Sequence, residues 1–548
     1  MFSQSSSSNL IKKDPFKRVI YLMMENHSFD QMLGSLTDLY PHMEGIDKAA
    51  LKFNPDMNNN PVFQQETYEK QILNDPIHEV PNVKIQLNGN KSDGFVKDFQ
   101  TNYPKSSAQE HTEIMGFYPR GFLPAMHALA ADFIICDHLH SSVPGPTWTN
   151  RFFALSGTSM GRVKMPEGIS DPNIIHEVSY QTQDTIFDRL NGAKKSWRVY
   201  FGDAPLSLVF ANQRQLHNLA HYHEMKTFYE DAKGPAANFP EFTFIEPKYL
   251  GSDQNDDHPP HNTMKAQKLI ADIYNAIRSN EELFQSTLFV IAYDEHGGFY
   301  DHVSPPSAIP PDAHKEEYTF DRLGVRVPAL LISPWFKKGV NQTVFDHTSL
   351  LKYLCDKWQL NPLGERTKQA NSIACAFDLN DSPRQDCVKN ITVTDADLVS
   401  FKPEIEKWNN NDNHAAIHSA VDFFNRESGT QASALSNLSL KASIEKSIGG
   451  MLLRCGMRRF GMWLQSDALA HRQARIKSTC DSVTQMITKA KTAANAGSSN
   501  QPASSSNSAE ECKSPGRHSI FAKNDTLSAP GKDTSNDNTI NLQVVRCI

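Results

Sequence analysis

The chain has 548 residues, of which 39% are hydrophobic and 21% are charged, and its formal net charge is −7. This length suits one large catalytic domain with smaller appendages, and so mild a charge argues against a general nucleic-acid-binding protein. No window approaches the roughly 20 apolar residues that a membrane-spanning helix needs, so we expect no transmembrane segment.

The N-terminus, MFSQSSSSNLIKKDPFKR, is rich in serine and lacks the apolar core of a signal peptide. We therefore expect residues 1–16 to be flexible. We also expect the protein to stay in the cytoplasm of the producing cell or to be exported without a signal peptide. The eight cysteines contain no CxxC pair. Free thiols are the favoured interpretation, with a Cys375–Cys387 bridge as the alternative.

Short apolar runs at 18–24, 286–293 and 327–335 predict buried strands. Residues 264–284 carry apolar side chains at intervals of three and four, which predicts a helix. Strands that alternate with helices indicate an α/β fold with a mostly parallel central sheet flanked by helices. In such sheets the chemistry lies at the carboxyl ends of the strands.

Composition changes near residue 428, so we expect a catalytic domain at 17–427 and a linker at 428–440. A basic helical segment at 441–491 and a disordered Ser/Asn-rich tail at 492–548 follow. Residues 441–490 hold nine Lys or Arg against three acids. This segment is interpreted either as an amphipathic helix that docks on a membrane or as a helix packed on the catalytic domain. The polar tail is compatible with signals read by specialised bacterial secretion machines.

Two pairs of polar residues directly follow predicted strands. Asp294 and Glu295 follow the run 286–293, and Glu25 and Asn26 follow the run 18–24. Glu25-Asn26 alone is readily explained as a helix N-cap. Adjacent carboxylates beyond a buried strand, however, repel each other without a counter-charge, and a divalent cation would supply one.

Two further motifs carry a hydroxyl and imidazoles. In SVPGPTWTNR, Thr147 and Asn150 follow a Pro-Gly-Pro turn, and NDDHPPHN contains Asp256, Asp257, His258 and His261. Taken alone, the first motif is explained as an ordinary turn and the second as a solvated loop kept extended by its prolines. Together with oxygen ligands for a cation, they are the parts that phosphoryl transfer needs.

These motifs resemble those of the phosphoesterase family, which includes bacterial phosphatidylcholine-preferring phospholipases C, plant non-specific phospholipases C and a bacterial acid phosphatase. The resemblance extends over about residues 17–378. It rests on the ordered motifs ENHSFDQMLG, DPIHEV, SVPGPTWTNR, DDHPPHN, YDEHGGFYDHV and DRLGVRVPALLISPW. It implies an alkaline-phosphatase-like core.

The resemblance assigns a metal site to Glu25, Asn26, Asp294 and Glu295, although the acid phosphatase has an aspartate where Glu295 stands. Zinc is the first expectation, because bacterial members of the lipase branch are described as zinc enzymes. Mn²⁺, Mg²⁺ and Ca²⁺ suit the same ligands.

Thr147 matches the family nucleophile. His258 and His78 match imidazoles that contact the phosphoryl oxygens or protonate the leaving group, and the division of these roles stays open. The remaining candidates for orienting or substrate-binding roles are Asn150, Asp257, His296, His302 and His347. The family usually has proline where this chain has Thr149.

The resemblance therefore predicts a metal-dependent phospholipase C that acts through a phosphothreonine intermediate on a phospholipid, with phosphatidylcholine as the expected substrate. The protein would bind the membrane surface peripherally. A phosphomonoesterase with the same site is the first alternative, and a catalytically silent lipid-binding protein is the second. The second alternative is disfavoured because Glu25, Asn26, Thr147, Asp294 and Glu295 are all chemically competent residues.

Overall fold

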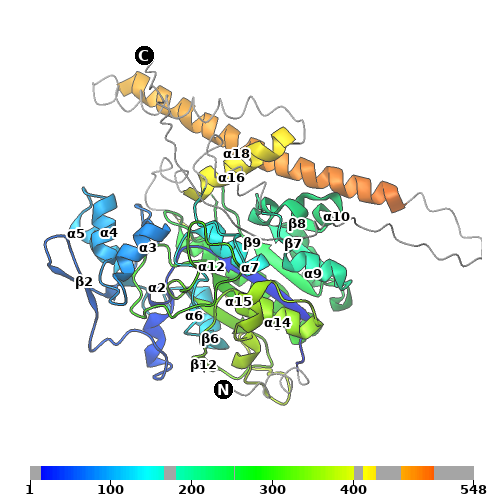
Figure 1. Cartoon of the computed structure of the whole chain (residues 1–548), viewed down its shortest axis with the longest axis horizontal. Helices are drawn as coiled ribbons and strands as arrows, with labels where there is room; N and C mark the ends of the chain where they lie inside the picture. The colour runs from blue at the N-terminus through cyan, green and yellow to red at the C-terminus, as the bar shows by residue number, and fades with distance from the viewer. Residues whose placement is uncertain (1–13, 166–180, 252, 400–411, 428–457, 499–548) are drawn as a thin grey trace, which may run out of the picture. The chain divides into compact units, whose positions relative to one another are not determined.

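The structure is a computed structural model that describes residues 14–165, 181–251, 253–399, 412–427 and 458–498 (Figure 1). The predicted linker 428–440 lies outside these residues. So do residues 1–13 of the expected flexible N-terminus and residues 499–548 of the expected tail.

An eight-stranded sheet lies at the centre of the described residues, in the order β12-β6-β11-β10-β1-β9-β7-β8. Strand β11 runs antiparallel to its neighbours β10 and β6, and the other neighbouring pairs are parallel. This confirms the predicted α/β fold with a mostly parallel sheet. The strands are β1 (Arg18–Met24), β6 (Ile134–Cys136), β7 (Trp197–Phe201), β8 (Tyr222–Glu224), β9 (Phe242–Glu246), β10 (Thr287–Tyr293), β11 (Ala329–Ile332) and β12 (Gly339–Asn341).

Two small sheets and a set of α-helices complete the described fold. The small sheets pair β2 (Phe53–Pro55) with β3 (Pro61–Phe63), and β4 (Gln65–Glu66) with β5 (Gly116–Phe117). The α-helices are α2 (Phe29–Met32), α3 (Val80–Leu87), α4 (Phe95–Asn102), α5 (Ala108–Ile114), α6 (Pro124–Ala130), α7 (Thr147–Ser156), α9 (Ile186–Gly192), α10 (Leu216–Leu219), α11 (Met225–Lys233), α12 (Thr263–Arg278), α13 (Glu281–Gln285), α14 (Thr348–Trp358), α15 (Gly364–Gln369), α16 (Asp412–Glu427) and α18 (Arg458–Ser498).

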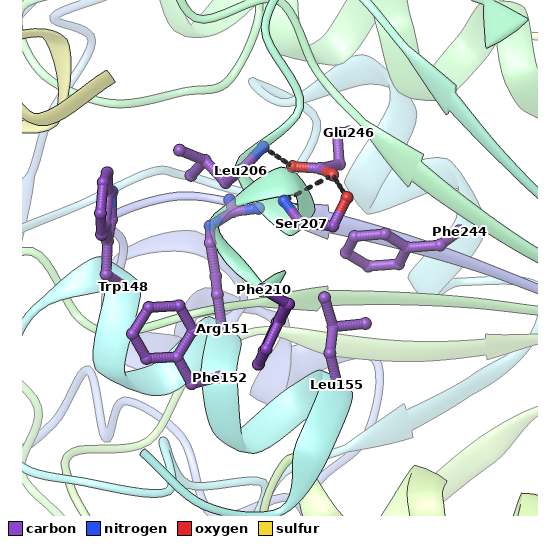
Figure 2. A pocket seen from close by; sticks show the side chains of 9 residues that line it. All are labelled: Trp148, Arg151, Phe152, Leu155, Leu206, Ser207, Phe210, Phe244 and Glu246. Atoms are coloured by element: carbon purple, nitrogen blue, oxygen red, sulfur yellow. Dashed lines mark hydrogen bonds between the residues drawn. The ribbon is translucent and has the colours of Figure 1, made fainter. Parts of the chain in front are cut away.

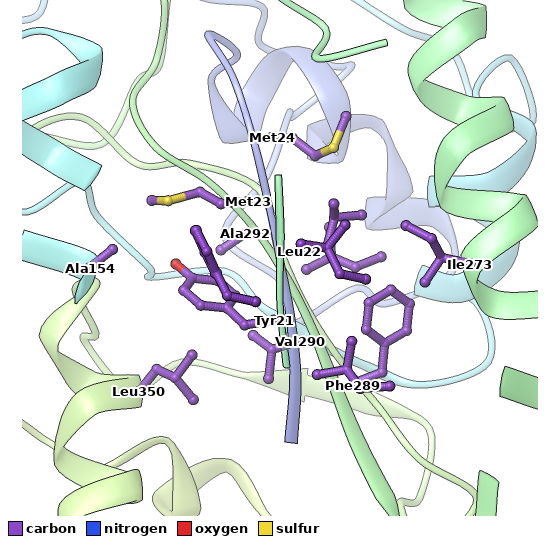
Figure 3. Close-up of a cluster of buried hydrophobic side chains, with 14 of the residues drawn as sticks. Tyr21, Leu22, Met23, Met24, Ala154, Ile273, Phe289, Val290, Ala292 and Leu350 are labelled. Atoms are coloured by element: carbon purple, nitrogen blue, oxygen red, sulfur yellow. The ribbon is translucent and has the colours of Figure 1, made fainter. Parts of the chain in front are cut away.

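Both faces of the central sheet are covered by helices. All seven residues of β1 are buried. Tyr21 lies on the side of Leu350 from α14, whereas Leu22 lies on the side of Ile273 from α12 (Figure 3). A strand buried on both faces is expected to read as a continuous apolar run rather than an alternating one. This explains why β1 and β10 were recognisable in the sequence.

The predicted elements at 18–24, 286–293 and 327–335 correspond to β1, β10 and β11. Strand β11 is shorter than predicted because Pro328 and Pro334 flank it. The helical pattern predicted at 264–284 is confirmed over most of its length, but it forms two helices, α12 and α13, and not one. Helix α12 ends at Arg278, and the Asn280 side chain starts α13 by accepting a hydrogen bond from the Leu283 N–H at 3.2 Å. A short polar side chain favours such a cap over a continuous helix.

The C-terminal helices pack on the main core through part of α18. Val483, Ile487 and Ala490 of α18 are buried in that core, and Arg475 forms an ion pair with Asp422 of α16. The exposed basic side chains Lys477 and Lys489 also lie on α18. Residues 441–457 of the predicted basic segment lie outside the described residues. None of the described helices combines the length and apolarity needed to cross a bilayer.

Candidate active site

Two loops that begin at the carboxyl ends of β1 and β10 bring the predicted metal ligands together. The strands pair in parallel with Met24 opposite Tyr293, so Glu25 and Asp294 leave the sheet side by side. The Asn26 N–H donates to Asp294 Oδ1 at 3.2 Å. All four predicted ligands have fully buried side chains: Glu25, Asn26, Asp294 and Glu295.

The close approach of these loops requires the first glycine of DEHGG. Asn26 and Gly297 each have a φ of +59°, in the left-handed region that glycine adopts most easily. A Cβ on Gly297 would lie 2.3 Å from the backbone oxygen of Asn26. Gly297 is thus needed both for its backbone angle and for the contact between the two loops.

Arg151 provides positive charge to the acids of both loops. Its guanidinium lies 3.1 Å from Glu25 Oε1 and donates from Nε to Asp294 Oδ2 at 2.9 Å. It also donates from Nη1 to the Tyr249 hydroxyl at 2.9 Å, and Tyr249 donates in turn to Glu246 at 3.2 Å. Arg151 therefore bridges the β1 and β10 loops and links them to the end of β9.

Glu246 is held by several donors of its own. Its carboxylate accepts from the Leu206 N–H at 2.7 Å and from the N–H and hydroxyl of Ser207 at 3.2 and 2.5 Å (Figure 2). Burial raises the pKa of Glu246, and the charge of Arg151 opposes that rise. Figure 2 shows this group beside a pocket whose other walls are largely aromatic and aliphatic, including Trp148 and Phe210.

The predicted nucleophile Thr147 is the first residue of α7 and is fully buried. Arg151 follows it by four positions, so both side chains lie on the same face of the helix. Asn150 accepts from the Val143 N–H at 3.0 Å and donates to backbone oxygens, including that of Gly145 at 2.9 Å. The Asn150 amide therefore holds the turn that precedes Thr147.

The two predicted catalytic imidazoles lie near each other, with ring centroids 6.1 Å apart. His78 Nδ1 lies 2.8 Å from the Pro76 carbonyl, and His258 Nδ1 lies 2.7 Å from the Pro259 carbonyl. A carbonyl oxygen can only accept, so Nδ1 carries the proton in both rings. His78 Nε2 is left facing the Asn26 amide nitrogen at 3.3 Å.

The DDHPPHN loop also contacts a helix from the C-terminal part of the chain. His261 donates from Nδ1 to Asp256 Oδ1 at 2.5 Å, and its ring stacks on His414 of α16 at 5.4 Å. His414 donates from Nε2 to the backbone oxygen of Tyr249 at 2.5 Å. Tyr249 therefore connects Arg151 to α16.

His296 and His347 contact the site through hydrogen bonds to neutral partners. His296 donates to Gln86 Oε1 at 2.8 Å and lies 3.8 Å from Glu295 Oε2. His347 donates to the Tyr293 backbone oxygen at 2.9 Å. Burial lowers the pKa of each imidazole. The hydrogen bonds of His296 and His347 therefore hold β10 and the loop that follows it.

The Asp257 side chain contacts residues next to the loops that follow β1 and β10. Its Oδ2 accepts from the Tyr293 hydroxyl at 2.6 Å, and its Oδ1 lies 3.5 Å from His27 Nε2. Its φ of +80° is unusual for a residue with a side chain. These contacts favour a role in shaping the DDHPPHN loop.

His302 belongs to an ion-pair cluster around Arg326. It lies 2.7 Å from Asp30 and 3.0 Å from Glu44, and Arg326 pairs with both Asp30 and Asp301 at 2.9 Å. Asp30, Asp301 and His302 offer ligand atoms within 4.8 Å of one another, an arrangement that could hold a metal ion. The Arg326 guanidinium already supplies positive charge there, so this cluster is interpreted as structural.

The His302 pair predicts a pH-dependent contribution to stability. Burial lowers the pKa of His302, but Asp30 outweighs this and raises it to about 9. The pKa of His302 in the folded protein therefore exceeds the usual value of about 6.5. The ion pair stabilises the fold fully below about pH 6.5, and this stabilisation is lost as pH rises through 9. His302→Gln should lower the free energy of unfolding by up to roughly 3 kcal/mol at pH 6 and by much less at pH 9.5. Urea unfolding at both pH values checks this, and an equal loss at both would contradict it.

The charge balance of the site fits a bound cation. The side chains of Glu25, Asp256, Asp294 and Glu295 are all buried here, and the guanidinium of Arg151 pairs with only two of these four carboxylates, Glu25 and Asp294. Burial, helped by the charge of Asp294 and opposed by His78, raises the pKa of Glu295 to about 8. Among the described residues, five buried side-chain oxygens of this region accept or donate no hydrogen bond: Asn26 Oδ1, Thr147 Oγ1, Asp256 Oδ2, Asp257 Oδ1 and Glu295 Oε1. Such oxygens suit a divalent ion.

Sequence reasoning missed several residues of this region, including Arg151, Glu246, Tyr249 and His414. Arg151 lies inside a motif that had been singled out, and its spacing of four from Thr147 was the available signal. His414 had no comparable signal, because it lies in a helix more than 60 residues beyond the last recognised motif.

Comparisons with known proteins match the same part of the chain. The profile of the Phosphoesterase family matches residues 16–361, which contain every predicted site residue but not His414. Non-specific phospholipase C3 of Arabidopsis thaliana is 31% identical over 423 residues, covering 71% of this chain and 78% of that protein. Phospholipase C B of Mycobacterium tuberculosis is 28% identical over 395 residues, covering 62% and 72%. A solved protein of the alkaline phosphatase superfamily from Vibrio parahaemolyticus aligns with a TM-score of 0.27 at 10% identity, covering 45% of this chain and 64% of that one.

Proposed function

Since the chain belongs to the Phosphoesterase family, we propose that it is a metal-dependent phospholipase C that releases diacylglycerol from glycerophospholipids. Family membership makes the protein a hydrolase of phosphoric esters. The relatives named above are phospholipases C, which supports a lipid substrate. Phosphatidylcholine is the substrate we infer first.

The observation that carries this proposal is the buried combination of a hydroxyl, four carboxylates, a guanidinium and two imidazoles. Thr147 opens α7, where the helix dipole favours an anionic phosphate. Arg151 lies one turn further along the same face. A site with these groups can hold a phosphodiester, attack it and protonate its leaving group.

Glu25, Asn26, Asp294 and Glu295 are the residues we propose to hold a divalent ion, with zinc first and manganese, magnesium or calcium as alternatives. When bound, the ion would supply the Lewis acidity that lets a threonine hydroxyl lose its proton at neutral pH. Arg151 would keep two of these carboxylates in place, because it contacts one from each loop.

In the proposed reaction Thr147 Oγ1 forms a bond to phosphorus as the bond to the glycerol oxygen breaks. His258, protonated on both ring nitrogens, gives its Nε2 proton to the departing glycerol oxygen, which leaves as diacylglycerol, while Nδ1 keeps its proton beside the Pro259 carbonyl. Nε2 regains a proton from the water that attacks in the second step. The phosphothreonine diester is then cleaved by water, which releases the phosphorylated head group. His78, held beside Asn26 and Glu295, would contact the phosphoryl oxygens.

A product assay on phosphatidylcholine vesicles tests the proposal. We expect diacylglycerol and phosphocholine as products, and loss of at least about 100-fold in rate after chelation, restored by one of the four ions. A phosphatase would instead release inorganic phosphate from soluble monoesters and leave the vesicles intact. Phosphatidic acid as the product, or full activity in the metal-free protein, would overturn the proposal.

A further inference from the structure

Large hydrophobic side chains are exposed on one short segment of the chain. Of the ten that are exposed among the described residues, five lie between positions 51 and 68. Their exposed fractions are 36% for Leu51, 52% for Phe53, 58% for Met57, 50% for Phe63 and 63% for Tyr68. We call the residues 51–63 the apolar hairpin, because they contain β2, its turn and β3.

The apolar hairpin turns two aromatic rings outward and a polar side chain inward, while Val62, opposite Asn54, packs against a small core. Phe53 and Phe63 are directly opposite each other, and their rings lie 5.4 Å apart on the exposed face. Asn54 points inward, donating to the Ser92 carbonyl at 2.9 Å and accepting from the Phe95 N–H at 2.8 Å. Because side chains alternate along a strand, these bonds oblige both rings to face outward.

The hairpin is anchored to the structure that carries His78. Strand β2 contacts α4, and β3 contacts α5. These helices share a small core with α3, which begins two residues after His78. Further along, the Lys70 carbonyl accepts from the Thr263 N–H at 2.9 Å, and Gln71 donates to the Pro260 carbonyl at 3.3 Å. Packing and hydrogen bonds therefore connect the hairpin segment to the loops that carry His78 and His258.

The charges around the hairpin indicate what covers it. Two lysines and four carboxylates lie between positions 47 and 69, and Lys48 and Glu66 pair at 3.4 Å. This mixture offers no positive surplus to an anionic surface, but it suits head groups that carry both signs. The exposed aromatic rings and methionine of the hairpin, surrounded by these charged residues, suit the acyl interior of a bilayer beneath its head groups. Tyr68, with an apolar ring and a polar tip, suits the boundary between them.

We propose that the apolar hairpin inserts into zwitterionic lipid bilayers and holds the enzyme on its substrate surface. This inference rests on the proposed function, since a bilayer is where a phospholipase meets its substrate. It differs from docking through the basic C-terminal segment, which would require anionic lipid and would weaken as salt rises. Binding through the hairpin should persist at about 0.5 M salt, because burial of apolar surface is not screened.

The test uses the full chain with Phe53→Ser and Phe63→Ser together, in a Thr147→Ala background so that lipid is not consumed. We expect sedimentation with phosphatidylcholine vesicles to weaken at least about tenfold, since each aromatic ring leaves the bilayer. The matched control replaces two exposed side chains elsewhere, Ile309→Ser and Val344→Ser, and should bind normally. With Thr147 restored, the hairpin variant should hydrolyse a soluble short-chain phosphatidylcholine within twofold of the unaltered enzyme.

A second measurement reports insertion directly. Phe53→Trp should add a tryptophan emission that shifts to the blue on vesicles and is quenched by lipids brominated in their acyl chains, relative to the unaltered protein. Equal vesicle binding by the hairpin variant and its control would overturn the inference, as would a change only in the protein's self-association. Vesicle binding that depends on the hairpin, with no hydrolysis of any phospholipid, would support insertion and reject the proposed function. Phospholipid hydrolysis together with vesicle binding that does not depend on the hairpin would support the proposed function and reject insertion.

Discussion

Replacing Thr147 with alanine is expected to lower turnover of phosphatidylcholine by about 10⁴-fold or more, the loss typical of removing a nucleophile. The fold should survive, because the Thr147 hydroxyl makes no hydrogen bond within the described residues and its removal leaves no partner unsatisfied. Thr147→Ser should retain measurable activity, since it keeps the oxygen and loses a methyl group. Initial rates of diacylglycerol release and a melting curve measure both effects.

Thr149→Ala is the matched control, because this threonine is also buried and lies two positions along the same helix. It should change turnover by less than about tenfold. Mass spectrometry of acid-quenched enzyme should find a phosphorylated head group on the peptide containing Thr147. Turnover that survives in Thr147→Ala would exclude the covalent route.

Replacing Arg151 with methionine should destabilise the protein by about 3–5 kcal/mol, as breaking a buried ion pair does. The methionine fills a similar space but leaves Glu25 and Asp294 without their guanidinium. Arg151→Lys should be intermediate, because one ammonium cannot reproduce the separate contacts that the guanidinium makes with the two carboxylates. Urea unfolding monitored by tryptophan fluorescence measures the loss.

Arg120→Met provides the contrast, because Arg120 forms an exposed pair with Asp38 at 3.2 Å. Exposed pairs contribute about 0–1 kcal/mol, so this variant should unfold close to the unaltered protein. Added divalent ion should restore part of the stability lost in Arg151→Met but not alter Arg120→Met. An Arg151→Met protein as stable as Arg120→Met would show that the buried acids are held neutral instead.

The fold class could be predicted because β1 and β10 are buried on both faces and read as continuous apolar runs. The loops that follow them could be paired from the rule that parallel strands end at one edge. The antiparallel direction of β11 could not be predicted, because direction depends on the connection and not on the residues of the strand. The break between α12 and α13 depends on one cap, at Asn280, within an otherwise helical pattern.

In the candidate site, too, some residues could be predicted from the sequence and others could not. The acids, the hydroxyl and the imidazoles could be predicted from sequence motifs. The residues that pair with them electrostatically are identified only by their contacts in the structure. Arg151 contacts carboxylates that follow β1 and β10, two paired strands that lie far apart in the sequence. His414 reaches His261 across the fold from α16. These contacts require the tertiary arrangement, and the local sequence signalled only that Arg151 lies four positions after Thr147.

The central position of β1 has a consequence for biosynthesis. The strand pairs with β9 and β10, so its earliest partner begins at residue 242 and the other at residue 287. A growing chain therefore carries an apolar segment with unpaired edges from the synthesis of β1 until β9, which begins at residue 242, has left the ribosome. Such segments attract other unfolded chains, and long-range pairing is slow to form. Recombinant production should accordingly benefit from slower translation and from chaperones that shield nascent apolar strands.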